Sequence, residues 1–251
     1  MDLHIVGCSG GMAPGRLPST YVIGGSLAVD AGALACGMPR ADQDGVAAVL
    51  VTHCHLDHVL GLPFAITERL DAKGVRPLRI VGPADVLDAL VDNLFSGPLW
   101  PDPRDWSINS EPIVRFEAVT PELPFELLGY TVRAIPLRHT IPCYGYLIER
   151  GPRSLFIAGD TDDADGSLTV AQGARAITLE VSFPNALQNV ADASGHLTSA
   201  TLGRALDRLR GDTQLIITHL KPGHEEQIAF ELNKLRHHHL TIASDGERHR
   251  F

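Results

Sequence analysis

The feature that most constrains the fold of this chain is the alternation of short apolar runs with helical patterns along its 251 residues. The runs are rich in β-branched residues, as buried strands are, and their alternation with helices is typical of an α/β protein. No long polar or low-complexity stretch offers a linker, so we expect one domain over residues 1–251. The candidate strands are Leu3–Gly7, Tyr21–Ile23, Leu27–Val29, Val46–Val51, Leu78–Val81, Ile113–Val119, Tyr130–Leu137, Tyr144–Ile148, Leu155–Ala158, Ile177–Leu179 and Leu215–Ile217. Helices are expected over Val59–Lys73, Ala84–Phe95, Thr198–Arg210 and Glu225–Arg236.

The composition narrows the classes of function. A net charge of −9 and a pI near 5.7 disfavour a broad electrostatic grip on a long nucleic acid, which needs many Lys and Arg contacts to phosphates. A small anionic substrate remains compatible, because bound divalent cations reverse the local sign of the charge. The chain begins with a strand pattern that has no basic head, and no apolar run reaches membrane-spanning length. Its four scattered cysteines do not form a disulfide framework, so we expect a cytoplasmic protein.

A cluster of three histidines and one aspartate follows directly after the candidate strand Val46–Val51. If the chain stays extended there, the first two histidines project to one side and the cysteine between them to the other, because strand side chains alternate. The aspartate and the third histidine lie beyond the turn, where they can face a second position nearby. Such a doubled set of ligands suggests two metal ions that share a solvent molecule. The run is Thr52-His53-Cys54-His55-Leu56-Asp57-His58, in which Cys54 is interpreted as a packing residue.

The same run has a simpler interpretation as a polar loop before the helix expected over Val59–Lys73. Asp57 would then cap the N-terminus of that helix, since a side-chain oxygen at this position accepts a backbone N–H. Three histidines and an aspartate at this spacing are much rarer than one ligand-like histidine, which favours the metal site.

Four further candidate strands also end in a residue of a metal-binding type. A lone His or Asp after a strand is more often a cap or turn residue, but the joint occurrence with the His-rich run favours one shared site. Imidazole and carboxylate ligands without a thiolate fit Zn²⁺, and they are also compatible with Mn²⁺ or Fe²⁺. We therefore predict two divalent ions, with zinc as the first choice. The four residues are Asp30, His139, Asp160 and His219.

The order of these residues resembles that of the metallo-β-lactamase superfamily, and the resemblance spans nearly the whole chain. It implies a four-layer αβ/βα sandwich, in which two mixed sheets are flanked by helices and the metals lie at one edge between the sheets. The implied roles are His53, His55 and His139 as ligands of one ion, Asp57, His58 and His219 as ligands of the other, Asp160 as the bridge, and Asp30 as the residue that orients a ligand histidine.

A glutamate and a histidine further along the chain point to one branch of this superfamily. Glu180 ends a candidate strand and His196 follows, and such a pair resembles the phosphodiesterase branch, which includes tRNase Z. A set of short motifs in order along the chain is similar, more specifically, to the class II cyclic-nucleotide phosphodiesterases. These motifs are Asn93-Leu94-Phe95, Leu99-Trp100-Pro101-Asp102, Tyr144-Gly145-Tyr146-Leu147-Ile148, Val181-Ser182-Phe183-Pro184-Asn185, Gly195-His196-Leu197-Thr198, His219-Leu220-Lys221-Pro222 and Asp245-Gly246-Glu247.

These resemblances predict a dinuclear phosphodiesterase that hydrolyses 3′,5′-cyclic nucleotides to 5′-monophosphates through a metal-bridging hydroxide. Asp57 is counted among the catalytic residues with Glu180 and His196. The leaving alkoxide needs a proton, and His196, held and made more basic by Glu180, is the candidate acid. In the alternative, His196 is only a surface residue ahead of the helix expected over Thr198–Arg210.

Three other functions remain open. A tRNase Z-like 3′-processing endoribonuclease would use the same ligands, but the acidic balance and the lack of a long Gly- or Lys-rich inserted arm disfavour it. A phosphodiesterase for other small cyclic diesters has the same sequence signals. A binding scaffold that has lost its metals is disfavoured, because every expected ligand position is filled.

Aromatic and basic residues near the motifs are candidate substrate contacts. Aromatic side chains can stack on a base, although in most proteins they are core or dimer contacts. The basic residues beside metal ligands can reach a phosphate, or they can be ordinary surface charges. The predicted substrate contacts are His224, Trp100 and Phe183, with Phe95, Trp106, Arg138 and Lys221 as further candidates.

Two further expectations concern surfaces. His237-His238-His239 follows the helix expected over Glu225–Arg236, and we interpret it as the cationic end of that helix and not as a ligand cluster. By resemblance the chain is expected to form a homodimer, with Ala84–Phe95 and the Trp100 segment as a possible contact.

Overall fold

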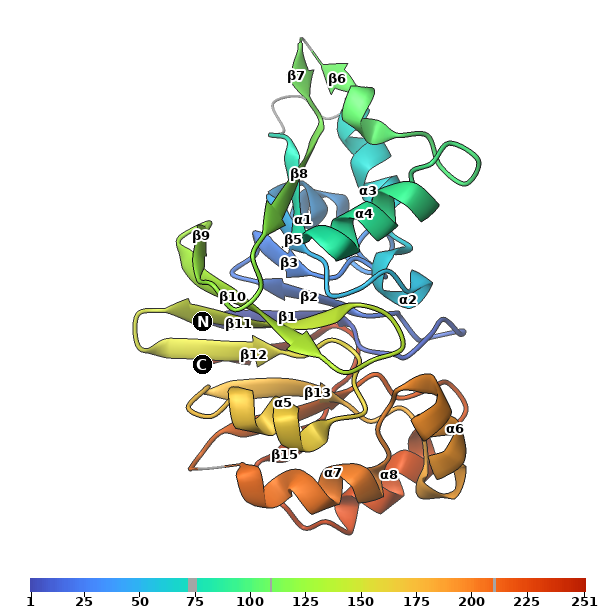
Figure 1. The fold of residues 1–251 in the computed structure, drawn as a ribbon, viewed down its shortest axis with the longest axis vertical. Helices are drawn as coiled ribbons and strands as arrows, with labels where there is room; N and C mark the ends of the chain where they lie inside the picture. The colour runs from blue at the N-terminus through green and yellow to red at the C-terminus, as the bar shows by residue number, and fades with distance from the viewer. Residues whose placement is uncertain (72–75, 109, 210) are drawn as a thin grey trace.

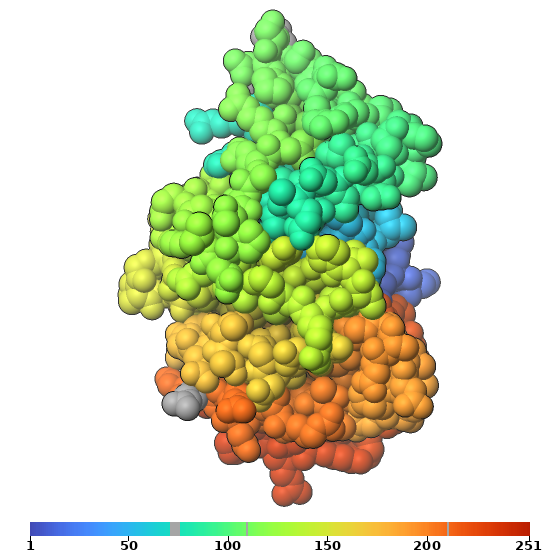
Figure 2. Space-filling view, in the orientation of Figure 1, coloured from blue at the N-terminus to red at the C-terminus, as the bar shows by residue number. Residues whose placement is uncertain are grey.

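Two mixed sheets lie face to face and carry helices on their outer sides (Figure 1), in a computed structural model that describes residues 1–71, 76–108, 110–209 and 211–251. In the space-filling view, the green segment with α4, β6 and β7 forms one end of the elongated molecule, and the orange and red helices form the other (Figure 2). This arrangement confirms the predicted four-layer αβ/βα sandwich.

The first sheet has the strand order β16-β1-β2-β3-β4-β5-β8. Its strands from β3 to β8 are parallel, whereas β16, β1, β2 and β3 pair antiparallel. The C-terminal strand therefore closes the edge beside the N-terminal one. The bounds are β1 (Asp2–Gly7), β2 (Thr20–Ile23), β3 (Leu27–Val29), β4 (Ala48–Leu50), β5 (Leu78–Pro83), β8 (Val114–Val119) and β16 (Glu247–Arg250).

The second sheet has the order β15-β14-β13-β12-β11-β10-β9. Strands β9 to β12 are antiparallel and β12 to β15 are parallel. The bounds are β9 (Phe125–Leu127), β10 (Tyr130–Leu137), β11 (Cys143–Arg150), β12 (Arg153–Ile157), β13 (Ala176–Glu180), β14 (Gln214–Thr218) and β15 (Leu240–Ile242), with β6 (Ser107–Ile108) and β7 (Glu111–Pro112) in a separate small hairpin.

The helices cover the outer faces of the sheets (Figure 1). Helix α4 packs on β5 and β8, whereas α5, α7 and α8 pack together below the second sheet. The helix bounds are α1 (Arg40–Gly45), α2 (Leu56–Val59), α3 (Leu62–Thr67), α4 (Ala84–Asn93), α5 (Ala164–Val170), α6 (Gln188–Ser194), α7 (Ser199–Ala205) and α8 (Glu225–Asn233), and the 3₁₀ turns are η1 (Glu68–Asp71), η2 (Pro103–Asp105), η3 (Asn185–Leu187) and η4 (Leu206–Arg208).

The apolar core between the sheets also positions the His-rich run. Tyr146 of β11 is fully buried, and its hydroxyl donates to the carbonyl of Val51 at 2.7 Å. The amide of Tyr144 donates to the carbonyl of Thr52 at 3.0 Å. The residues directly before His53 are therefore tied to the opposite sheet, which gives the run a rigid base.

All four predicted helices are shorter than the sequence indicated. The helices expected over Ala84–Phe95 and Glu225–Arg236 end at Asn93 and Asn233, and the other two are divided. The helix expected over Val59–Lys73 is divided into α2, α3 and η1, because Pro63 lies in the first turn of α3 and cannot donate a backbone hydrogen bond to a preceding turn. Lys73 lies outside the described residues. The helix expected over Thr198–Arg210 ends at Ala205 and continues as η4, and Arg210 is also outside the described residues.

The apolar runs predict the bounds of the main strands more accurately, because a strand in a sheet needs apolar residues on each face that it buries. Among the described residues, no helix is long and apolar enough to cross a membrane.

Candidate metal centre

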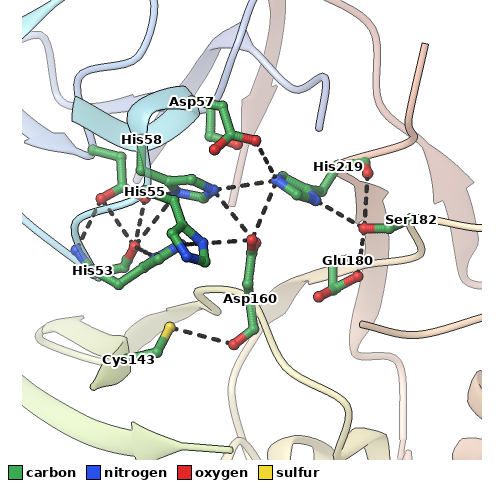
Figure 3. Close-up of polar contacts among 12 residues, drawn as sticks. His53, His55, Asp57, His58, Cys143, Asp160, Glu180, Ser182 and His219 are labelled. Atoms are coloured by element: carbon green, nitrogen blue, oxygen red, sulfur yellow. Dashed lines mark hydrogen bonds and ion pairs between the residues drawn. The ribbon is translucent and has the colours of Figure 1, made fainter. Parts of the chain in front are cut away.

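The predicted ligands come together where strands of both sheets end (Figure 3). Parallel neighbours present their carboxyl ends at the same edge of a sheet, so β3 and β4, and likewise β12, β13 and β14, deliver the residues that follow them to one place. The residues so delivered are Asp30 after β3, His53 to His58 after β4, His139 after β10, Asp160 after β12, Glu180 at the end of β13 and His219 after β14.

Three histidines form what we call the first half-site: His53, His55 and His139. His55 Nδ1 lies 3.1 Å from His53 Nε2 and 3.2 Å from His139 Nε2. Tetrahedral zinc with bonds of 2.0–2.1 Å to nitrogen would separate its ligand atoms by about 3.3–3.4 Å. The spacing of the three nitrogens therefore fits a metal ion, and Asp160 Oδ2, 3.6 Å from His53 Nε2, is a fourth donor.

Asp57, His58 and His219 form the second half-site. His219 Nε2 lies 3.2 Å from His58 Nε2 and 3.3 Å from Asp57 Oδ2. Asp160 reaches this group too, with Oδ1 3.4 Å from His58 Nε2 and Oδ2 3.4 Å from His219 Nε2. Asp160 thus lies between the half-sites, at the centre of Figure 3. The geometry brings together the same two groups that the resemblance implied, and the role of each residue as a ligand stays a prediction.

Burial keeps the first half-site uncharged. It lowers the pKa of His53 well below the ordinary value of histidine, and it also lowers the pKa of His55 and of His139. Neutral imidazoles have a free lone pair on one ring nitrogen, which is the form that binds metal ions. The electrostatics of these three side chains therefore suit a ligand role.

The second half-site is more strongly charged. Burial lowers the pKa of His58, but the carboxylates of Asp160 and Asp30 outweigh it and raise this pKa well above the ordinary value. Burial raises the pKa of Asp160, yet His219, His58 and His53 outweigh it and hold this pKa well below the ordinary value. The ionised carboxylate of Asp160 is the group in this environment that a divalent cation would stabilise.

Asp30 contacts the outer nitrogen of one of these histidines. Its Oδ2 lies 2.7 Å from His58 Nδ1, which leaves His58 Nε2 for the metal side. Thr52 holds the carboxylate in turn, because its amide donates to Asp30 Oδ1 at 2.8 Å and its hydroxyl donates to Asp30 Oδ2, also at 2.8 Å. Sequence reasoning did not single out Thr52, although the residue directly precedes the His-rich run.

His139 is held by the backbone at Gly195. Its Nδ1 lies 2.9 Å from the carbonyl oxygen of Gly195, which accepts the imidazole N–H. Gly195 ends α6 in the left-handed region with a φ of 70°, and a Cβ there would lie 2.8 Å from His139 Nδ1. Glycine is therefore required for both the backbone turn and the approach of the imidazole.

Glu180 and His196 form a buried pair beside the half-sites. His196 Nδ1 lies 2.7 Å from Glu180 Oε1 and 3.9 Å from Asp160 Oδ2. Burial lowers the pKa of His196, but the Glu180 carboxylate outweighs it and raises this pKa above the ordinary value. His196 is only 6% exposed, so it is not the surface residue of the alternative interpretation. Ser182 contacts both Glu180 and His219. It lies in one of the short motifs, but the sequence predicted no role for it.

The predicted substrate contacts fall in two places. Phe183 lies beside the buried pair, with its ring centroid 5.8 Å from that of His196 and 6.5 Å from that of His224. Trp100 lies against Phe64 of α3, at a centroid distance of 5.0 Å. Phe183 thus lies beside His196, and His224 lies on the other side of a contact with Phe183.

The other aromatic and basic candidates have structural partners. Phe95 is fully buried beside Phe116, which agrees with the core alternative, and Trp106 packs against the same core. Arg138 forms an ion pair with Asp162. Lys221 Nζ lies 3.7 Å from Asp57 Oδ2, at the second half-site.

Two residue groups that looked like ligands lie apart from the half-sites. Cys54 donates its thiol to the carbonyl of Val86 at 3.1 Å, and burial raises the pKa of this thiol to about 12. His237 and His239 face each other in the turn after α8, with ring centroids 6.2 Å apart. The Cys54 contact agrees with the packing interpretation. The helix-end interpretation is wrong in its position, because α8 ends at Asn233 and has no basic residue in its last turn.

Comparisons with known proteins show the family of this chain. A family model described as "Beta-lactamase superfamily domain" matches residues 26–220. The chain belongs to this superfamily. A ribonuclease Z from Mycobacterium bovis (strain BCG) is 30% identical over an alignment of 235 residues, with 84% of this chain and 83% of that protein covered.

Two solved structures resemble this member of the superfamily over nearly its full length. YhfI from Bacillus subtilis, a metallo-β-lactamase fold protein, has a TM-score of 0.80 at 20% identity and covers 99% of both chains. Unliganded yeast PDE1 also has a TM-score of 0.80, at 16% identity, and covers 98% of both chains. The comparisons confirm the predicted family and the predicted class, a metal-dependent hydrolase of the phosphodiesterase and nuclease group.

Proposed function

We propose that this protein is a two-metal phosphodiesterase that hydrolyses small anionic diesters, with 3′,5′-cyclic nucleotides such as cAMP and cGMP as the first candidates. The observation that carries this proposal is the Glu180–His196 pair, buried beside Asp160 and therefore next to both half-sites. A diester needs both an activated nucleophile and a proton donor for its leaving alkoxide, and this arrangement offers a place for each.

The donor atoms of the two half-sites suit two divalent ions. All are imidazole nitrogens or carboxylate oxygens, and within each group that could hold an ion they lie within 4.8 Å of one another. When bound, such ions supply an activated water and neutralise charge on the phosphate oxygens. We infer zinc from the histidine-rich donor set and the short spacing of the nitrogens.

His196 is the proposed proton donor. Its Nδ1 is engaged by Glu180, so Nε2 is the nitrogen left to donate a proton to the leaving oxygen. In a 3′,5′-cyclic nucleotide the P–O3′ bond breaks, O3′ takes the proton, and the 5′-monophosphate is released. Glu180 keeps the imidazole in the required orientation and stabilises its protonated form.

The surroundings favour a small substrate. Phe183 lies beside His196 and His224 lies beside Phe183, so a base could stack there. Lys221, next to Asp57, adds a positive charge at the second half-site. The net charge of −9 opposes a long polyanion.

A second candidate is 3′ processing of precursor tRNA. The sequence similarity to a ribonuclease Z favours it, and the same half-sites and the same Glu180–His196 pair would serve that reaction.

One hydrolysis panel tests the proposal: metal-loaded protein with cAMP, cGMP, 2′,3′-cyclic nucleotides, a nitrophenyl diester and precursor tRNA. We expect cAMP or cGMP to be cleaved fastest, and His196→Gln to lower kcat by about 100-fold or more with unchanged metal content. His238→Gln, at an exposed histidine far along the chain, is the matched control and should retain full activity. Intact cyclic nucleotides beside a cleaved diester would refute the substrate assignment, and cleavage of precursor tRNA alone would favour the second candidate.

A further inference from the structure

The hydroxyl of one buried serine lies between the second half-site and the Glu180–His196 pair. We propose that Ser182 is a positioning residue, which through this single hydroxyl orients both His219 toward the metal side and Glu180 toward His196. The proposal builds on the proposed function, because it gives Ser182 a purpose only if both groups act in one reaction.

The distances assign the proton of this hydroxyl. Ser182 is fully buried, and its Oγ lies 2.6 Å from Glu180 Oε2 and 2.8 Å from His219 Nδ1. A hydroxyl has one proton to donate, and two acceptors lie near it: Glu180 Oε2 at 2.6 Å and the carbonyl oxygen of His219 at 3.1 Å. The carboxylate is charged and closer, so Ser182 donates to Glu180. Its lone pair is then available to accept the Nδ1–H of His219. This places the free lone pair of His219 on Nε2, the atom that faces Asp57 and Asp160.

The same hydrogen bond completes the set around the glutamate. Glu180 Oε1 accepts from His196 Nδ1 at 2.7 Å and from the amide of Thr161 at 2.9 Å. Its Oε2 accepts from Ser182 at 2.6 Å and from the amide of Leu197 at 3.2 Å. Four donors therefore hold the carboxylate, and two of them are the side chains of His196 and Ser182. Loss of one of these donors removes a hydrogen bond from a buried carboxylate oxygen, so the carboxylate of Glu180 can rotate.

The backbone at Ser182 is held independently of the hydroxyl. Its amide donates to the carbonyl of Leu197 at 3.0 Å, and its carbonyl accepts from the amide of Lys221 at 3.2 Å. Removal of the Oγ atom therefore leaves the path of the chain after β13 in place. Ser182→Ala therefore tests the hydrogen bonds of the hydroxyl without a change in the backbone path after β13.

The test compares Ser182→Ala and Ser182→Thr with Ser167→Ala. Ser167 is an equally buried serine in α5, whose hydroxyl donates to the carbonyl of Asp163 at 2.8 Å, so it matches the loss of one buried hydroxyl. The first readout is zinc affinity, measured with zinc alone by competition with a chelator. The second is kcat and KM on a nitrophenyl diester, and circular dichroism confirms that each variant is folded.

We expect Ser182→Ala to weaken the binding of one zinc ion by about 10- to 100-fold, since this is the usual effect of losing a partner behind a ligand histidine. Its kcat should fall more than its KM rises, because the variant changes the orientation of His196 but not the groups that would bind the phosphate. Ser182→Thr should restore both values, and Ser167→Ala should leave both unchanged.

Two results would overturn the proposal: unchanged zinc affinity in folded Ser182→Ala, or a Ser182→Thr variant that is as impaired as the alanine variant. The zinc measurement does not depend on a substrate. If zinc affinity changes as expected while the unaltered protein cleaves no diester, the positioning role stands and the proposed function fails.

Discussion

The two half-sites consist of similar residues but are supported in different ways. Behind the histidines of the second half-site stand carboxylates, because Asp30 contacts His58 directly and Glu180 contacts His219 through Ser182. A carboxylate behind an imidazole increases its basicity and fixes the ring nitrogen that faces the metal. The second half-site therefore depends on buried charge.

In the first half-site the outer partners are neutral. The hydroxyl of Thr52 lies 3.0 Å from His53 Nδ1, and the carbonyl of Gly195 accepts from His139 at 2.9 Å. Neutral partners orient the rings without adding charge, in agreement with the lowered pKa that burial gives His53 and His139. Carboxylates orient the histidines of the second half-site, whereas neutral hydroxyl and carbonyl groups orient those of the first. We therefore expect the second half-site to bind its ion more tightly than the first.

The largest effect should come from the residue that the half-sites share. Asp160→Ala removes a carboxylate whose oxygens approach ligand atoms of both half-sites. We expect zinc content to fall to one equivalent or less, and diester hydrolysis to fall by more than about 100-fold. Asp162→Ala, two residues further on, is the control for a lost carboxylate. Two tightly bound ions in Asp160→Ala would contradict the shared role.

A smaller effect should be confined to the second half-site. Asp30→Asn keeps an oxygen for the amide of Thr52 but removes the negative charge behind His58. We expect one zinc affinity to fall by about 10- to 100-fold while the other stays constant, as measured by a two-step chelator titration. An equal loss in both steps would break the distinction between the half-sites.

In the first half-site we expect zinc binding to depend on steric fit around His139 and not on a charged partner. Gly195→Ala places a methyl group 2.8 Å from His139 Nδ1. Gly173→Ala is the matched control, because Gly173 has a φ of 89° and open space around the new Cβ. Both variants should lose about 1 kcal/mol of stability in thermal or urea unfolding, through left-handed backbone strain. Only Gly195→Ala should also weaken zinc binding, by about 10-fold. The same zinc affinity in both variants would contradict the proposed contact.

The smallest effect is expected inside the His-rich run itself. Cys54 belongs to neither half-site, so Cys54→Ala should leave zinc content and kcat unchanged and cost about 1 kcal/mol of stability. Burial raises the pKa of Cys54 to about 12, so at pH 8 a thiol reagent should label the exposed Cys36 and leave Cys54 unmodified. Rapid labelling of Cys54 in folded protein, detected by peptide mass, would show that its side chain faces solvent.

Much of the fold was predictable because its signals are local. Every second residue of β10 is buried up to Ala134, and such an alternating pattern is visible in the sequence, so Tyr130–Leu137 was predicted with the same bounds as β10. The helix expected over Val59–Lys73 shows the limit of such reasoning. Its apolar pattern continues through Pro63, but the missing backbone donor there starts a new helix, and the direction of α3 depends on packing.

The sequence by itself predicted which residues meet at the strand ends. Side-chain alternation places His53 and His55 on one side, and the resemblance to the superfamily implies that Asp160 joins them. Only the tertiary structure decided which group forms a hydrogen bond to each ligand histidine on the side away from the metal. Hydroxyl groups and backbone carbonyls are common throughout a chain, and they acquire a role only when segments distant in sequence lie side by side. Ser182 thus reaches His219, 37 residues further on, because β13 and β14 are adjacent parallel strands whose ends bring both side chains into one buried space.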